Sequence, residues 1–156
     1  MAAAATVAFV LAGAVLTGPL LGVFEPPPQT DEIGDGTAQV GSVSAPTYDV
    51  VVTYGRFGTD TWYLRAPDAT VRVDGTDGRS RLVARLRVPA LSVDEVARQS
   101  IPPGGTGRYT LSTGSIALGP DRPTGGPFRG RLTVSVQSFR GDRTVFNETV
   151  TVEVAE

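Results

Sequence analysis

The chain has 156 residues and a formal charge of −2, from 14 basic and 16 acidic side chains. This near balance excludes the strongly basic composition of nucleic-acid-binding domains. Cysteine and histidine are absent and every basic residue is arginine, which excludes disulfides, the usual zinc ligands and the side chains that most often activate nucleophiles. We therefore expect no enzyme, with no catalytic residue, no cofactor and no metal site. The length suffices for one domain with its own core.

The first 24 residues predict a membrane segment. Residues 2–24 carry no charge, and as a helix they would span roughly 35 Å, against about 30 Å of bilayer hydrocarbon. Pro19 near the outer end is tolerated in such helices. The alternatives are a cleaved signal peptide with Val7–Leu16 as its apolar region, or a buried apolar helix. We favour a single-pass anchor in the cell membrane with the C-terminal domain outside, since no arginine before Arg56 opposes export.

A polar linker follows the segment. Pro26–Pro28 stop any helix and favour an extended spacer. We therefore expect an anchor or signal over 1–24, a Pro-rich linker over 25–36 and a β-domain over 37–156.

The remainder shows apolar residues with a period of two, which is typical of half-buried strands. In 81–88, for example, Leu82, Ala84, Leu86 and Val88 alternate with the arginines. Turn clusters separate the strands, which we expect over 37–44, 48–54, 62–65, 70–74, 81–88, 108–113, 115–118, 131–139 and 144–154.

Two local patterns interrupt this series. Ser92 and Glu95 form a capping-box pattern that predicts a short helical turn ending near Gln99. Near Gly141 a two-residue turn would set one strand's apolar face beside the other's polar face. We therefore expect a three-residue loop or a bulge there. The expected partners are Val136 with Phe146 and Leu132 with Val150.

Short strands with frequent turns predict an all-β fold. We expect a single antiparallel β-sandwich of immunoglobulin-like type, preceded by one N-terminal apolar transmembrane helix. A closed barrel is the alternative.

Two stretches, 55–68 (GRFGTDTWYLRAPD) and 134–146 (VSVQSFRGDRTVF), resemble uncharacterised exported proteins of haloarchaea. The resemblance covers most of residues 34–156. It implies a membrane-anchored β-sandwich in the envelope of an archaeon from a high-salt habitat, and it implies no activity or site residues.

Several residues are candidates for binding or modification. Asn147 begins the glycosylation triplet Asn-Glu-Thr and should be exposed. The stripe of Arg81, Arg85 and Arg87, with Arg72 beside it, is either a solvated face or a binding surface. Trp62 and Tyr63 could belong to an aromatic platform, although core packing is the commoner role of large rings. Its other members would be Tyr48, Tyr54, Phe57 and Tyr109.

Acidic residues give only weak metal signals. Asp31, Asp35 and Gly36 match part of a calcium loop, but Ile33 and Ser42 stand where ligands are needed. A second set of aspartates could hold a calcium ion between loops, although aspartate is also common in turns for conformational reasons. Its members are Asp60, Asp68, Asp74 and Asp77.

The function predicted from these features is a non-enzymatic, membrane-anchored extracellular module with a structural or protein-interaction role at the cell envelope. Residues 2–24 would bind the membrane, and another envelope protein is the expected partner. The alternative is a carbohydrate- or ion-binding module that uses the loops 55–60, 74–78 and 119–127. A hydrolase with paired carboxylates is a third hypothesis.

Overall fold

The computed structural model describes residues 33–48, 50–56, 58 and 60–155. The predicted N-terminal helix, most of the 25–36 linker, Asp31 and Phe57 lie outside the described residues. The chain divides into two compact units, 1–30 and 31–156, and the described residues all belong to the second. Within this described part, no helix is both long and apolar enough to cross a bilayer.

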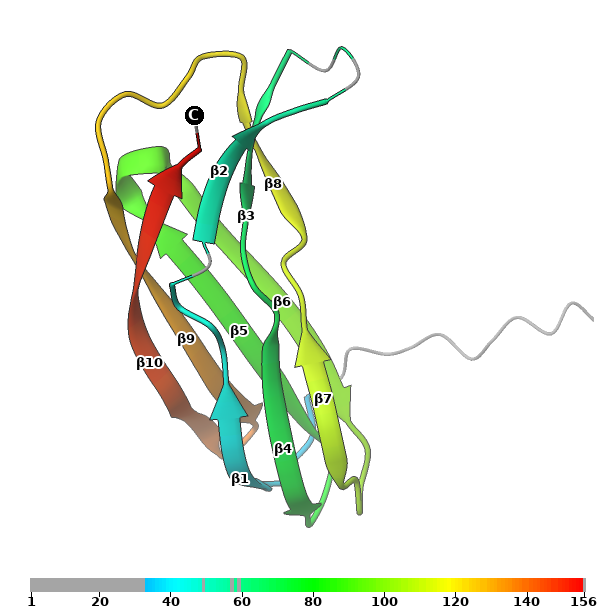
Figure 1. The fold of residues 1–156 in the computed structure, drawn as a ribbon. Coiled ribbons are helices and arrows are strands. Elements are labelled where there is room, and N and C mark those ends of the chain that lie inside the picture. Colours follow the sequence, from blue (N-terminus) through cyan, green and yellow to red (C-terminus); the bar gives the residue numbers. More distant parts are fainter. Residues whose placement is uncertain (1–32, 49, 57, 59, 156) are drawn as a thin grey trace, which may run out of the picture. The chain divides into compact units, whose positions relative to one another are not determined.

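The described residues form ten strands, one 3₁₀ turn and no α-helix, so the predicted all-β class is confirmed (Figure 1). The turn, η1, is Pro89–Leu91. The strands are β1 (Ala38–Ser44), β2 (Val50–Tyr54), β3 (Trp62–Arg65), β4 (Ala69–Thr76), β5 (Ser80–Val88), β6 (Val93–Ile101), β7 (Gly107–Leu111), β8 (Ser115–Gly119), β9 (Phe128–Ser138) and β10 (Gly141–Val154).

The strands form two sheets, β1-β4-β7 and β6-β5-β9-β10-β2-β3-β8. In Figure 1, β1, β4 and β7 lie in front of β5, β6, β9 and β10, and β2, β3 and β8 lie above them. We call β6-β5-β9-β10 the back layer and the other six strands the front layer. Every pairing is antiparallel except that of β2 with β10, which is parallel. The expectation of a purely antiparallel fold is wrong at this one pair.

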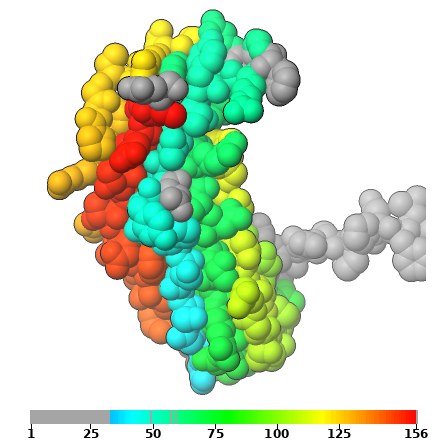
Figure 2. All heavy atoms as spheres, in the orientation of Figure 1, coloured from blue at the N-terminus to red at the C-terminus, as the bar shows by residue number. Residues whose placement is uncertain are grey.

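The front layer is interrupted between β1 and β2, between β3 and β4, and between β7 and β8. The three segments contain Pro46, Pro67 and Gly114, the last at φ +66°. Proline offers no N–H to a ladder, and positive φ is incompatible with strand geometry. β3 pairs with β8 on one side of the interruptions and β4 with β7 on the other. In Figure 2, β1, β4 and β7 lie side by side as one continuous surface.

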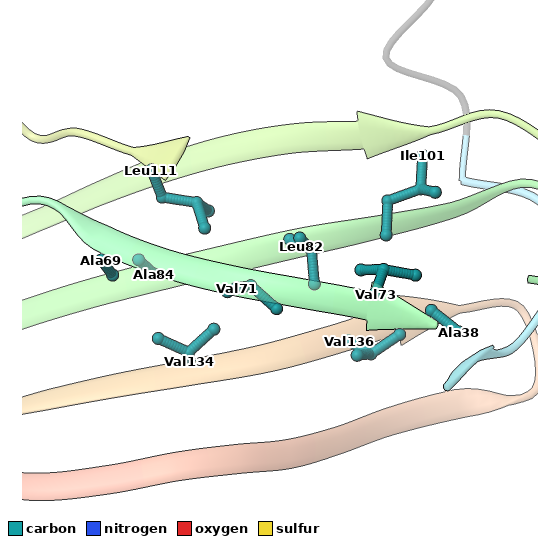
Figure 3. Close-up of a cluster of buried hydrophobic side chains, with 10 residues drawn as sticks. All are labelled: Ala38, Ala69, Val71, Val73, Leu82, Ala84, Ile101, Leu111, Val134 and Val136. Atoms are coloured by element: carbon teal, nitrogen blue, oxygen red, sulfur yellow. The ribbon is translucent and has the colours of Figure 1, made fainter. Parts of the chain in front are cut away.

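Two clusters of buried side chains fill the space between the layers. Members of the first point toward one another from both layers (Figure 3); they are Ala38, Ala69, Val71, Val73, Leu82, Ala84, Ile101, Leu111, Val134 and Val136. The second contains Val50, Val52, Leu64, Leu86, Val88, Val93, Leu132, Val150 and Val152. Ala45 and Phe146 pack against both clusters, which join into one core. Burying one such Val or Leu contributes about 1.5–3 kcal/mol.

The helical turn predicted from Ser92 to near Gln99 is wrong. β6 begins at Val93 and pairs with β5 along its whole length without a register shift. Ser92 adopts a left-handed conformation, φ 54°, and its N–H donates to the Pro89 carbonyl at 3.0 Å. Val93 and Ile101 at the ends of β6 are buried. The β5 ladder and this burial outweigh a local capping pattern.

The β9–β10 hairpin contains the predicted bulge but not the predicted register. Phe139 and Arg140 form a tight turn, and the ladder shifts between Thr144 and Phe146. The observed pairs are Phe146 with Val134 and Val150 with Gly130, where the sequence predicted Phe146 with Val136 and Val150 with Leu132. The register differs because the turn precedes Gly141, which opens β10.

Residues 34–36, expected at the end of the linker, are hydrogen-bonded to the β-domain. The Gly34 carbonyl accepts from Phe139 N at 2.8 Å, and Gly36 N donates to the Arg79 carbonyl at 3.1 Å. A Cβ on Gly36 would stand 2.2 Å from the backbone of Gly78. Glycine is therefore required for this close approach.

Candidate binding surfaces

The outer face of the back layer carries a cluster of arginines. Along β5, arginines alternate with the buried Leu82, Ala84 and Leu86, as the sequence predicted. The cross-strand pairs place further arginines of β6 and β9 on the same face. We call this surface the arginine face; its arginines are Arg81, Arg85, Arg87, Arg98, Arg129 and Arg131.

A shallow groove of about 300 Å³ crosses the arginine face. Val83 lies opposite Arg98 of β6 on one side and Ser135 of β9 on the other. In the next row Arg85 lies opposite Val96 and Thr133. The lining therefore combines a small apolar area with hydroxyl and guanidinium groups. Such a surface offers hydrogen-bond donors to a polar partner.

Asp94 neutralises part of this charge. Arg85 Nε and Nη2 donate to its two carboxylate oxygens, each at 2.6 Å, and Arg87 Nε lies 3.5 Å from Oδ2. The hydrogen bond and charge of Arg85 lower the pKa of Asp94, and Asp94 raises the pKa of Arg85. Both side chains are more than a third exposed, so this pair contributes little to stability and mainly orients Arg85.

The other arginines of this face are not neutralised. Arg98, Arg129 and Arg131 form no ion pair with any residue that the structure describes. Asp142 lies at the margin, where it accepts from Gln137 Nε2 at 3.1 Å. The arginine face is therefore positive, although the whole chain has a net charge of −2.

Arg72 does not join this stripe. It lies on β4, in the other sheet, opposite Arg108 of β7. Its Nε lies 3.3 Å from Asp74 Oδ1. The expectation that Arg72 stands beside Arg81 and Arg85 is wrong, because β4 and β5 are consecutive in sequence but belong to different layers.

A second candidate surface lies at the β2–β3 end of the domain. The rings of Tyr54 and Trp62 lie 5.1 Å apart with an interplanar angle of 60°. The Arg122 guanidinium carbon lies 5.5 Å from the Trp62 ring centroid, a cation–π distance. The hydroxyl of Tyr54 donates to Asp60, and this bond raises the pKa of Tyr54. An open depression of about 550 Å³ adjoins Arg122.

The expected aromatic platform does not assemble in full. Tyr48 is 79% exposed and Tyr54 49%, so neither fills the core. Tyr63 lies on the opposite face of β3 from Trp62, because adjacent strand residues alternate. Tyr109 packs against the first core cluster. Among the described rings, Tyr54 and Trp62 are the pair that comes together.

The three loops of the alternative site do not converge. Loops 55–60 and 119–127 lie at one end of the domain, and residues 74–78, which include the last residues of β4, lie at the other end (Figure 1). Arg122 brings loop 119–127 to Trp62. The structure therefore does not bring the three loops together, whereas the two loops at one end share a surface.

The carboxylates of the acidic turn residues accept hydrogen bonds from, or form ion pairs with, groups of this chain. Asp77 accepts from the backbone N–H of Thr37 at 2.5 Å, and this bond lowers the pKa of Asp77. Asp74 pairs with Arg72 and Asp60 with Tyr54. No group of three acidic side chains that could hold a metal ion occurs in the described part of the chain.

Asn147 is exposed, as the sequence predicted. It lies on β10 opposite Thr133. Thr133 lies opposite Arg85, so Asn147 is on the arginine face, about 10 Å from Arg85 across two strand spacings.

No protein-family model matches this sequence, and a search of curated proteins finds no relative.

Sequence reasoning missed four arginines of these surfaces. Arg98 falls in the segment predicted as a helical turn. Arg129 and Arg131 alternate with Gly130 and Leu132, so extending the period-two pattern to Phe128 would identify them. Arg122 carries no sequence signal, since its contact depends on how the loop folds back.

Proposed function

We propose that this protein is a non-enzymatic interaction module of the cell envelope. Residues 2–24 anchor it in the cell membrane as a single-pass helix, and the β-domain outside binds another envelope protein through the arginine face. The observation that carries the proposal is the concentration of unneutralised arginines on one face of a net-acidic chain. Charge complementarity favours a partner protein with an acidic surface.

The sheet topology supports an immunoglobulin-like domain. A three-stranded sheet, β1-β4-β7, faces β6-β5-β9-β10, and neighbours that are distant in sequence, such as β5 and β9, pair. Domains of this architecture are common in extracellular recognition proteins. The haloarchaeal resemblance supports the same location.

A binding assay with an acidic probe tests the role of the arginine face. Immobilised polyglutamate should retain the protein at low salt and release it as salt rises. The double variant Arg129→Glu/Arg131→Glu should weaken binding about tenfold. The control is Arg108→Glu on the outer face of the other sheet, which should have a smaller effect. Equal loss in both would contradict a specific face.

The anchor has its own test. N-terminal sequencing of the protein from native membranes should show that residues 1–24 are retained, and protease added to intact cells should remove the β-domain. A mature N-terminus near Glu25 would sink the anchor and leave an exported, cleaved protein.

The Tyr54–Trp62 pair favours carbohydrate binding as a second function. An aromatic ring beside a carboxylate, here that of Asp60, suits both the apolar face and the hydroxyls of a sugar. Arg122 covers the Trp62 ring, so a sugar would have to displace it. Trp62 is the chain's single tryptophan, and its fluorescence should change on titration with oligosaccharides. Arg122→Ala should tighten binding; an unchanged spectrum in both proteins would argue against this function.

A further inference from the structure

The two sheets have four edge strands, β1, β7, β6 and β8. Three of them are poor templates for another strand. β7 and β8 have five residues each, and β1 contains two register shifts in its pairing with β4. Short or bulged edges resist pairing with another chain.

β6 has none of these protections. It has nine residues, contains neither proline nor glycine, and pairs with β5 without a shift. An antiparallel strand paired on one side directs its remaining N–H and C=O groups outward. The described side chains make one hydrogen bond with its backbone, from Gln99 Nε2 to the Ser100 carbonyl at 3.3 Å. With respect to the described residues, β6 therefore presents a long edge that is open to pairing.

We propose that β6 pairs antiparallel with β6 of a second copy of this chain, across a two-fold axis that passes beside Val96. An axis perpendicular to the sheet keeps each residue on its own face, so facing residues must both be even-numbered or both odd-numbered. With Val96 opposite Val96 of the second copy, Asp94 of each copy lies opposite Arg98 of the other. Cross-strand pairs of opposite charge stabilise a sheet.

Charge selects this register over its neighbour. A dimer centred on Ala97 would place Arg98 opposite Val96 and Asp94 opposite Ser100, which leaves both charges unmatched. In the register centred on Val96, Glu95 faces Ala97 of the second copy, so no like charges lie directly opposite. Arg98 also has no ion-pair partner among the described residues of its own chain. The second copy supplies one.

The pairing has a consequence for the arginine face. Because the axis is perpendicular to the sheet, the arginine faces of both copies lie on the same side and form one surface of doubled width. A dimer would bind a repeated or extended acidic partner at two points, which raises apparent affinity without a new contact. The dimer itself does not rest on the proposed partner.

A cysteine scan tests the register directly, since the native chain contains no cysteine. In the full-length protein in detergent, Val96→Cys should form an intermolecular disulfide on mild oxidation, because facing Cβ atoms lie about 5 Å apart. Ala97→Cys should cross-link more slowly, and Thr110→Cys on β7 controls for random collision. Equal rates at all three positions would overturn the proposal.

Light scattering of the same detergent-solubilised protein tests the charge pairs. Wild type should be dimeric, and Arg98→Glu, which places like charges opposite each other twice, should weaken the dimer about tenfold. Arg108→Glu makes the same charge change on the other sheet and should leave the dimer intact. A monomeric wild type contradicts the proposal. If the dimer survives Arg98→Glu and the Val96→Cys variant does not cross-link, the copies associate elsewhere, which contradicts the proposal equally.

Discussion

The two layers of the domain pack against the same core, but the strands of one are continuous and those of the other are interrupted. In the back layer β5, β6, β9 and β10 run unbroken over 9, 9, 11 and 14 residues. In the front layer the chain changes sheet at Pro46, Pro67 and Gly114. The continuous layer presents a regular array of side chains and a long free edge. The interrupted layer brings loops and the Tyr54–Trp62 pair to one end. A few proline and glycine positions in the front layer therefore account for the contrast between the regular back layer and the loop-bearing end of the domain.

The largest expected effect is a loss of stability on truncating a core leucine. It tests whether core residues of the two layers contribute equally to the stability of the fold. Leu86 of β5 and Leu64 of β3 are 1% and 0% exposed and belong to the same cluster. Leu86→Ala and Leu64→Ala should each cost about 2–5 kcal/mol, through lost burial and the cavity left behind. Urea denaturation followed by Trp62 fluorescence measures both. A cost below about 1 kcal/mol for Leu64→Ala alone would show that the front layer packs loosely.

A smaller effect tests the close packing of the back layer. A Cβ on Gly130 would lie 2.6 Å from the Arg87 carbonyl oxygen and 2.7 Å from Val88 Cγ2. Gly130→Ala should therefore destabilise by about 1–3 kcal/mol. Gly75→Ala in β4 is the matched control, since that Cβ meets nothing within 4 Å. Similar denaturation midpoints for the two variants would refute the idea that β9 is the tighter strand.

Substitution of Gly114, at the interruption between β7 and β8, should destabilise the fold less. Its φ is +66° with open space around the Cβ position, so Gly114→Ala introduces backbone strain without a clash, at about 1 kcal/mol. Gly114→Asn should recover part of the loss, because asparagine tolerates this conformation. Thermal unfolding measures both, and a neutral alanine variant would show that the turn changes conformation freely.

The smallest effect concerns the Asp94–Arg85 pair and its pH dependence. Because Arg85 lowers the folded-state pKa of Asp94, the pair stabilises the fold above the unfolded pKa of about 3.9. This contribution is lost as pH falls through the folded-state value. Asp94→Asn should thus be slightly less stable at neutral pH and converge with wild type below about pH 4. A constant difference across this range would assign the effect to packing.

Much of the fold followed from local pattern. β3 has the predicted bounds, and the buried faces of β5 and β9 are those that alternation predicted. β6 was missed because Ser92 and Glu95 give a capping signal within four residues, whereas the competing ladder with β5 depends on the tertiary fold. The bulge in β10 was predicted in kind but not in place. Its position depends on where the turn forms.

The candidate surfaces were predictable only strand by strand. Alternation placed Arg81, Arg85 and Arg87 on one face, but the neighbours of β5 could not be known without the strand order. That order placed Arg131 beside Arg87 and moved Arg72 to the other sheet. Tyr48 was expected in the core because it continues the alternation of Val50, yet β2 begins only at Val50 and leaves it exposed.

The parallel pairing of β2 with β10 gives the domain a mechanical property. Val50, Val51 and Val52 pair with the end of β10, and Ala155 N adds a bond to the Val52 carbonyl at 2.9 Å. Tension applied to the chain on the N-terminal side of β2 and the C-terminal side of β10 pulls parallel strands in opposite directions along their length. The bonds between them then share the load in shear, whereas a hairpin pulled at its open end unzips one bond at a time. Force applied between these two points is therefore carried by the β2–β10 pairing as a whole.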